Sequence, residues 1–171
     1  MKRELPAAVA LLGLAVVLPL SRAGAAPASR TTEPVTLKSD ASAAVGSSTL
    51  TRTPSGVSFS LQTTRLSPGH AVTVWWMVAN PDGGMAVLYA AGHVIDDSGT
   101  AEFGGSLKAG DSDGLVMGDD TSMEDVLGAT VSLVVRDHGE ADPATVNDQV
   151  HTFAACNSVC QDLQLSVHSP S

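Results

Sequence analysis

The sequence predicts an all-β fold: an antiparallel β-sandwich or barrel of about seven to eight strands, with one or two short connecting helices. Short runs rich in Val, Thr, Ser and Trp recur along the chain, and turn residues separate them at nearly even intervals. Strands do not alternate with long helical patterns, which argues against a parallel α/β sheet. The chain of 171 residues is also short enough for one domain with a single core.

The N-terminus has the three parts of a secretory signal peptide. Lys2 and Arg3 precede an apolar run over residues 5–20, and the small residues 23–26 follow it as a cleavage site. The run is interrupted by proline and is shorter than the roughly 20 apolar residues that a membrane-spanning helix needs. We therefore predict that residues 1–26 are removed, which leaves a periplasmic or extracellular protein without a membrane span.

The next segment, residues 27–47, is rich in Ala, Ser, Thr and Pro and carries few large apolar side chains. That composition is typical of a flexible tether rather than of a packed element. Within it, Val35–Leu37 could add a first edge strand. A single β-domain is therefore predicted over residues 48–171.

Short β-patterned runs between turn signals predict the strands of that domain. They cover Ser48–Thr53, Gly56–Thr63, Ala71–Val78, Ala86–Ile95, Ala101–Leu107, Thr130–Arg136 and Leu163–His168. The turns between them are rich in Gly, Pro, Asn and Asp, as in Pro54–Gly56, Ser67–Gly69, Asn80–Gly84 and Asp96–Gly99.

Two short helices are expected as connections between strands. A Ser-x-x-Asp pattern followed by glycine predicts a capped helix over residues 123–127. Asp142 before Pro143 is typical of an N-cap with proline in the first helical position, which predicts a second helix that ends near Gln149.

The run His70–Val78 is apolar on both faces, which predicts a central strand. Successive side chains of a strand point to opposite faces, so Trp75 and Trp76 must point to opposite sides of the sheet. One of them is expected to anchor the core, and the other a second contact layer under a loop or at an interface.

Several short motifs stand out along the domain. They are Gly-His-Ala-x-Thr-x-Trp-Trp at residues 69–76, Ala-Ala-Gly-His-Val at 90–94, Arg-Asp-His-Gly at 136–139, His-Thr-Phe at 151–153 and Val-His at 167–168. Over about residues 48–170 the chain thereby resembles a group of uncharacterised secreted bacterial proteins. Members of that group often carry cysteines in the loop after the Asn-Pro that follows the tryptophan strand, whereas this chain has Asp82–Gly84 there. The resemblance implies export and a β fold, and it implies no particular activity.

Cys156 and Cys160 are the only cysteines of the chain. Export would place them in an oxidising compartment, which favours a disulfide between them. Closing so small a loop stabilises a fold by roughly 2 kcal/mol on the chain-entropy model. Redox motifs more usually have the spacing Cys-x-x-Cys. Metal ligation and free thiols are the alternatives.

Histidine is the residue type that most suggests a function. His70, His93, His138, His151 and His168 all lie in the predicted β-domain. If strand ends bring their imidazoles together, they would form a copper or zinc site. No pair has the His-x-His or His-x3-His spacing that places two ligands on one face of a strand or helix. The alternative is isolated histidines that are either buried and hydrogen-bonded or exposed.

An acidic loop is the second candidate site. Asp111, Asp113, Asp119 and Asp120 offer carboxylate oxygens of the kind that bind calcium. The glycine that follows Asp113 directly does not match the ligand order of an EF-hand. A solvated acidic loop is the alternative.

Charge and motifs narrow the classes of function. The net charge is −9; removing residues 1–26 takes away three of nine basic and one of eighteen acidic residues, which leaves six and seventeen and a net charge of −11. Nucleic acid is therefore excluded as a partner, because binding to phosphates needs a positive patch. No serine lies in a Gly-x-Ser-x-Gly elbow, and no glycine loop suits a phosphate, so an enzyme is not indicated.

Two functions remain after these exclusions. The preferred hypothesis is an exported, non-catalytic domain with a binding or structural role, whose ligand is a protein, a glycan or a metal ion. The alternative is a histidine-based copper or zinc protein with a redox or metal-handling role.

Overall fold

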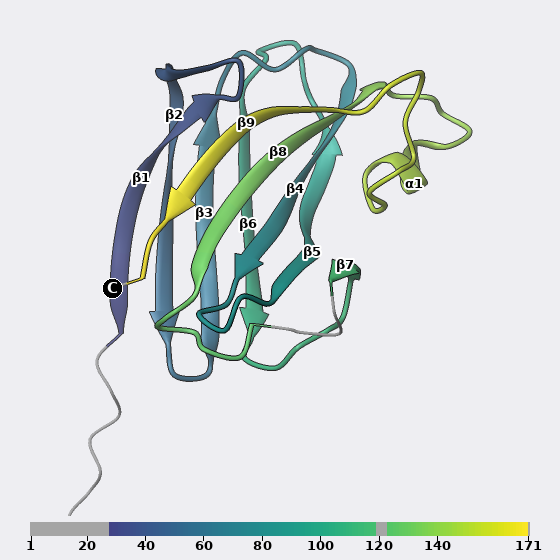
Figure 1. Cartoon of the computed structure of the whole chain (residues 1–171). Helices are drawn as coiled ribbons and strands as arrows, with labels where there is room; N and C mark the ends of the chain where they lie inside the picture. Colours follow the sequence, from purple (N-terminus) through teal and green to yellow (C-terminus); the bar gives the residue numbers. More distant parts are fainter. Residues whose placement is uncertain (1–27, 119–122, 171) are drawn as a thin grey trace, which may run out of the picture.

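A computed structural model describes residues 28–118 and 123–170 (Figure 1). In this part of the chain, one antiparallel sheet of nine strands and one short helix form the fold, which confirms the predicted all-β class. The elements are β1 (Ser29–Leu37), β2 (Asp40–Thr53), β3 (Gly56–Thr63), β4 (His70–Ala79), β5 (Met85–Val94), β6 (Ala101–Lys108), β7 (Leu115–Gly118), β8 (Thr130–Glu140), α1 (Val146–Gln149) and β9 (Gln161–His168). Across the sheet their order is β6-β3-β2-β1-β9-β8-β4-β5-β7.

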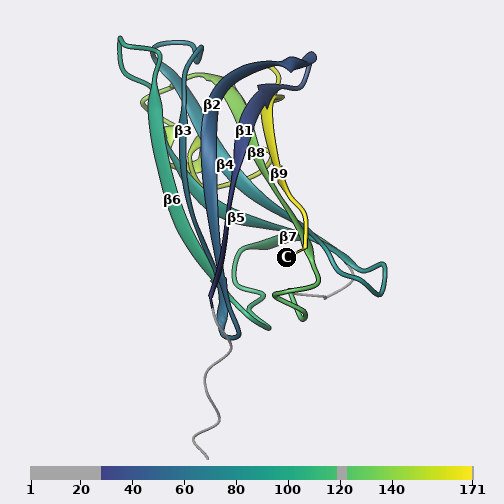
Figure 2. The ribbon, with the colours of Figure 1, turned by 90° about the vertical axis from the view of Figure 1, so that its left-hand side faces the viewer.

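The sheet curls into a half-barrel and stays open along one line. Bulges in β2, β5 and β9 bend these strands, since an extra residue on one side of a ladder increases the local twist. Figure 2 looks onto β1, β2, β3 and β6, with β4 and β5 crossing behind them. β5 comes to lie beside β6, yet no ladder joins the two strands among the described residues. We call this line, where β5 and β6 pack against each other without a ladder, the seam.

The inner face of the curled sheet holds the hydrophobic core. In β3, the buried residues Val57, Phe59 and Leu61 alternate with exposed polar ones, as expected of a strand with one solvated face. Trp76 of β4 points to the same core, and its ring meets Phe59 edge-on with the centroids 4.8 Å apart. Trp76 is thus the tryptophan that anchors the core.

The outer face of β4 is covered by the segment that contains α1, which lies beside the sheet in Figure 1. Trp75 is fully buried there, with its ring edge-on to Phe153 at 5.0 Å and to Tyr89 at 5.5 Å between centroids. Arg136 closes this layer, because its guanidinium lies 3.9 Å from the centre of the Phe153 ring. The predicted second contact layer under a loop is confirmed.

One stretch of the inner wall is polar. The side chain of Arg52 is buried, and its guanidinium donates hydrogen bonds to the main-chain carbonyls of Val126, His168 and Ser169 at 2.6, 3.1 and 3.3 Å. Arg52 therefore fastens the loop before β8 and the end of β9 to β2.

The prediction of a flexible tether over residues 27–47 is wrong for the residues that the structure describes. Residues 29–37 form β1, and residues 40–47 are the first half of β2. β1 pairs with β2 along its length and with β9 at its end, so Val35–Leu37 is not an edge strand. The sequence carries few large apolar residues here because hydrogen bonds of the ladder and a few inward side chains, such as Val35 and Val45, are enough to hold the strands.

Of the two predicted helices, the first is absent and the second is present in the described part of the chain. Residues 126–128 form a turn instead of a helix, because the Asp125 carboxylate accepts hydrogen bonds from the N–H groups of Leu127 and Gly128 at 3.1 and 2.9 Å. The second helix exists as α1 and begins later than predicted, after a turn in which the Asp142 carboxylate accepts the N–H of Ala144.

The seven predicted strands correspond to β2–β6, β8 and β9, whereas β7 was not predicted. The predicted signal peptide lies outside the described residues. Among those residues, none of the helical structure is long and apolar enough for a membrane span.

Candidate functional site

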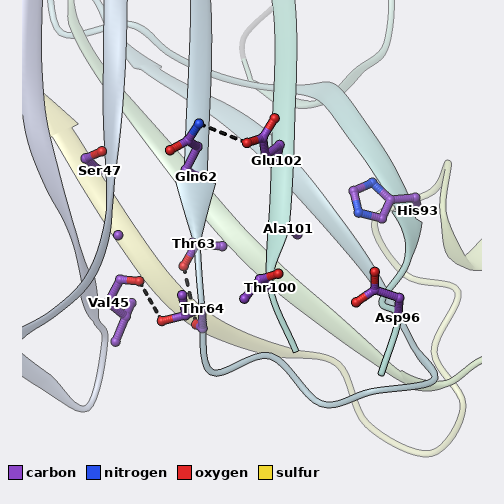
Figure 3. Close-up of a pocket in the computed structure, with 11 residues that line it drawn as sticks. Val45, Ser47, Gln62, Thr63, Thr64, His93, Asp96, Thr100, Ala101 and Glu102 are labelled. Atoms are coloured by element: carbon purple, nitrogen blue, oxygen red, sulfur yellow. Dashed lines mark hydrogen bonds between the residues drawn. The ribbon is translucent and has the colours of Figure 1, made fainter. Parts of the chain in front are cut away.

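A pocket of about 780 Å³ crosses the seam near one end of the half-barrel (Figure 3). One side is formed by β2, β3 and the start of β6, and the other by the end of β5 and the turn after it. The lining residues are Val45, Gly46, Ser47, Gln62, Thr63, Thr64, His93, Asp96, Thr100, Ala101 and Glu102.

The wall between β2 and β3 depends on one glycine. Gly46 pairs with Thr63, and a Cβ atom on Gly46 would lie 2.0 Å from the carbonyl oxygen of Gln62. Glycine is therefore required for the two strands to approach so closely. Thr64 extends the wall, since its N–H and its hydroxyl both donate to the carbonyl of Val45, at 3.0 and 2.9 Å.

Asp96 is held in place by the turn that follows β5. Its Oδ1 accepts the hydroxyl and the N–H of Ser98, at 2.5 and 2.9 Å. These hydrogen bonds lower the pKa of Asp96, so the group is a carboxylate at neutral pH. Its Oδ2 has no hydrogen bond to any described residue and remains available to a ligand.

His93 stands on the β5 side of the pocket. Its ring stacks on Phe103 of β6, with centroids 4.6 Å apart and planes 23° from parallel, so it is one of the contacts that bridge the seam. Desolvation lowers the pKa of His93, and this effect outweighs the negative charge of Asp96, which raises the pKa. The imidazole is therefore neutral at pH 7. Neither ring nitrogen is hydrogen-bonded within the described part of the chain.

Gln62 and Glu102 face each other across the β3–β6 ladder. The amide nitrogen of Gln62 donates to Oε1 of Glu102 at 2.9 Å, which fixes the orientation of the amide (Figure 3). The amide oxygen of Gln62 and Oε2 of Glu102 are left as acceptors for a ligand. The pocket as a whole thus presents several acceptors and one neutral imidazole.

Comparison of the chain with protein-family models, with curated proteins and with solved structures gives no match. The resemblance to secreted bacterial proteins therefore stays a prediction. Function has to be argued from the site itself.

The five histidines do not form a common site in the described part of the chain. His70 begins β4, His93 lies near the end of β5, His138 near the end of β8, His151 after α1, and His168 at the end of β9. The one group of three metal-ligating side chains found among the described residues joins His138 to Cys156 and Cys160.

Two of the histidines contact a neighbouring residue at the end of an element. Nδ1 of His70 lies 3.0 Å from both carboxylate oxygens of Asp137, and His151 donates from Nδ1 to the carbonyl of Asn147 at 2.7 Å. These contacts hold the start of β4 to the end of β8 and the end of α1 to the segment after it, respectively.

His168 is sealed in the polar inner wall. Its Nε2 lies 2.7 Å from Oγ of Ser48, and its Nδ1 lies 2.8 Å from Oγ1 of Thr31. The first distance would suit a nucleophile and its base, but Ser48 is 1% and His168 0% exposed, and Thr31 takes the place of the usual carboxylate. Desolvation lowers the pKa of His168, so this group is a neutral, structural histidine.

His138 ends a buried chain of hydrogen bonds. Trp75 donates from Nε1 to Oγ1 of Thr73 at 2.6 Å, and Oγ1 lies 2.7 Å from Nε2 of His138. Because the carbonyl of Ala155 can only accept, Nδ1 carries the imidazole proton, and the unprotonated Nε2 accepts the hydroxyl proton of Thr73. Nδ1 donates that proton to the carbonyl of Ala155 at 2.8 Å. Desolvation lowers the pKa of His138, in agreement with this neutral form.

Cys156 and Cys160 form the predicted disulfide, with their Cα atoms 5.3 Å apart. The bridge lies against His138, since Sγ of Cys160 is 3.6 Å from its Nδ1. Each cysteine is half-buried.

The acidic loop is only partly described. Oδ1 of Asp111 accepts the N–H of Asp113 at 3.1 Å, which is a local turn contact. Asp119 and Asp120 lie outside the described residues, so the calcium site stays a prediction.

Gln62, Asp96 and Glu102 of the pocket are not among the site residues predicted from the sequence. Gln62 and Glu102 are polar residues on exposed strand positions, and that pattern is the same for any solvated face. Only the pairing of β3 with β6 brings them together, and local sequence patterns do not reveal that pairing.

Proposed function

We propose that the protein is an exported, non-catalytic domain that binds a small polyhydroxylated ligand, such as a mono- or disaccharide, in the pocket at the seam. The observation that carries this proposal is the lining of the pocket. Gln62, His93, Asp96 and Glu102 all keep polar atoms that no other described residue engages.

The chemistry of these groups favours a neutral ligand with several hydroxyls. Carboxylate and amide oxygens accept hydrogen bonds from hydroxyl groups, and the flat imidazole of His93, held by Phe103, can pack against the C–H face of a sugar ring. The two carboxylates and the net charge of −11 disfavour anions. A pocket of this size also falls within the range of about 300–1,000 Å³ that small ligands occupy.

Binding is better supported than cleavage. A glycoside hydrolase needs one carboxylic acid that stays protonated, with a raised pKa, beside a second carboxylate. At Asp96 the hydrogen bonds from Ser98 lower the pKa. The close serine–histidine pair of Ser48 and His168 is buried away from solvent.

The proposal is tested by NMR titration of the protein lacking residues 1–26. Glucose, N-acetylglucosamine, maltose and cellobiose are added to millimolar concentration, and the amide and imidazole resonances are followed. We expect one of these saccharides to shift the resonances of His93, Asp96 and Glu102 together.

His93→Ala and Glu102→Gln remove ligand contacts and are expected to weaken binding, whereas His151→Ala changes an exposed histidine outside the pocket and serves as the matched control. Shifts confined to residues outside the pocket, or no shift with any of the saccharides, would refute the assignment. Release of free glucose from maltose or cellobiose would refute the non-catalytic part.

Export is supported by the predicted signal peptide together with the disulfide. Expression of the full chain in a bacterial host, followed by N-terminal sequencing of the exported fraction, tests it. A mature protein that begins near Pro27 is expected, and a protein retained in the cytoplasm with its first residues intact would contradict export.

A further inference from the structure

A compact set of soft ligand atoms lies on the outer side of the sheet, away from the pocket. Sγ of Cys156, Sγ of Cys160 and a ring nitrogen of His138 all lie within 4.8 Å of one another. His138 is buried on β8, and the two cysteines flank a turn of three exposed residues before β9. In the oxidised protein the two sulfurs are bonded to each other, so they cannot bind a metal ion as thiolates.

We propose that the Cys156–Cys160 disulfide masks a copper site: after reduction, the two thiolates and Nδ1 of His138 bind one Cu(I) ion. Thiolates are the ligands that select soft ions such as Cu(I), and Cu(I) accepts three-coordinate sites. A zinc ion held by three side chains needs a water molecule or a substrate as its fourth ligand, whereas Cu(I) needs only the three side chains that this group offers. The site is independent of the ligand proposed for the pocket.

The chemistry of unmasking is an exchange with a dithiol donor. The donor gives two electrons and two protons, the S–S bond between Cys156 and Cys160 breaks, and the donor forms its own disulfide. Binding of Cu(I) then releases both thiol protons to solvent. The turn is accessible to such a donor, because Val159 is 66% exposed and Asn157 and Ser158 are exposed beside it.

Thr73 suits the ligated form of the imidazole, whereas the carbonyl of Ala155, which accepts the Nδ1 proton at 2.8 Å in the oxidised protein, has to move away from Nδ1. For Nδ1 to bind the metal, its proton must move to Nε2, and the imidazole stays neutral. Nε2–H would then donate to Oγ1 of Thr73, which is already 2.7 Å away and held by Trp75. A ligating histidine usually donates its second ring N–H to such a fixed acceptor.

The test compares oxidised protein with protein reduced by a phosphine, both lacking residues 1–26. Cu(I) is supplied as its complex with the chromogenic chelator bathocuproine disulfonate, and loss of the colour reports transfer to the protein. We expect stoichiometric transfer to the reduced form and none to the oxidised form. Equal transfer to both forms, or none to either, overturns the proposal.

Variants and NMR identify the ligands. Cys156→Ser with Cys160→Ser is expected to abolish transfer under reducing conditions, while His151→Ala, an exposed histidine elsewhere, retains it. Thermal melts establish that each variant is folded. Because His138 is buried and its replacement could unfold the protein, its role is read in the unaltered chain: long-range ¹H–¹⁵N spectra are expected to change from the Nδ1–H to the Nε2–H form on copper binding. An unchanged His138 spectrum, or transfer that persists in the double serine variant, overturns the site.

Discussion

His168 is expected to make the stability of the fold depend on pH. Its side chain is 0% exposed, and desolvation lowers its pKa below the ordinary value of 6.5, with Arg52 acting in the same direction and Glu33 against it. The unfolded chain therefore binds a proton near pH 6.5, whereas the folded chain does not. Stability that is present above pH 6.5 is lost as the pH falls below it, until the pKa of the folded state is reached.

The size of the effect follows from the linkage relation. Between the two pKa values, one buried neutral histidine changes the free energy of unfolding by about 1.4 kcal/mol per pH unit. Against a typical total stability of about 5–15 kcal/mol, a change of one or two pH units is easily measured. Other groups titrate as well, so the contribution of His168 is measured as the difference in pH slope between the unaltered protein and a variant that lacks this histidine.

The assay is urea denaturation at a series of pH values between about 5 and 8, with the free energy of unfolding extrapolated to water. His168→Asn keeps a polar side chain but does not titrate, so its slope below pH 6.5 is expected to be smaller than that of the unaltered protein by about 1.4 kcal/mol per pH unit. If the asparagine variant and the unaltered protein have the same slope, His168 is not a buried neutral group and the argument fails.

Two further changes test the packing of the sheet and the disulfide. Gly46→Ala is expected to destabilise the fold by at least about 2 kcal/mol, because its Cβ would meet the carbonyl oxygen of Gln62 at 2.0 Å; Gly104→Ala, where the nearest atom is 3.5 Å away, is the matched control and is expected to change the urea midpoint little. Equal midpoints for both variants would contradict the close approach of β2 and β3. Reduction of Cys156–Cys160 is expected to lower stability by about 2 kcal/mol, as the chain-entropy model gives for so short a loop. A midpoint that does not move on reduction would show that the bridge contributes nothing to stability.

The strand pattern was predictable because it is local. Alternation along β3 and the doubly apolar pattern of β4 can be read from consecutive residues, and they also predicted that Trp75 and Trp76 lie in different layers. The composition of residues 27–47 predicted a flexible tether instead of two strands for a related reason. β1 and β2 are held by backbone pairing with each other, and that pairing needs few large side chains.

The candidate sites depend on contacts that no local pattern encodes. Gln62 and Glu102 meet because β3 pairs with β6 across two intervening strands of the chain. In the same way, His138 meets Cys160 because the segment after α1 folds back over β8. The histidines looked like a set in the sequence, yet the fold distributes them over four strands and a helix end.

The seam gives the sheet the mechanics of a strip instead of a closed ring. In a closed barrel, any change of circumference breaks hydrogen bonds between strands. Here no ladder joins β5 to β6, so the contacts that resist their separation are packing contacts, such as His93 against Phe103 and Gly105 against the carbonyl of Ala90. The pocket spans this line, so a molecule that touches both of its sides would hold β5 and β6 together at this end of the half-barrel.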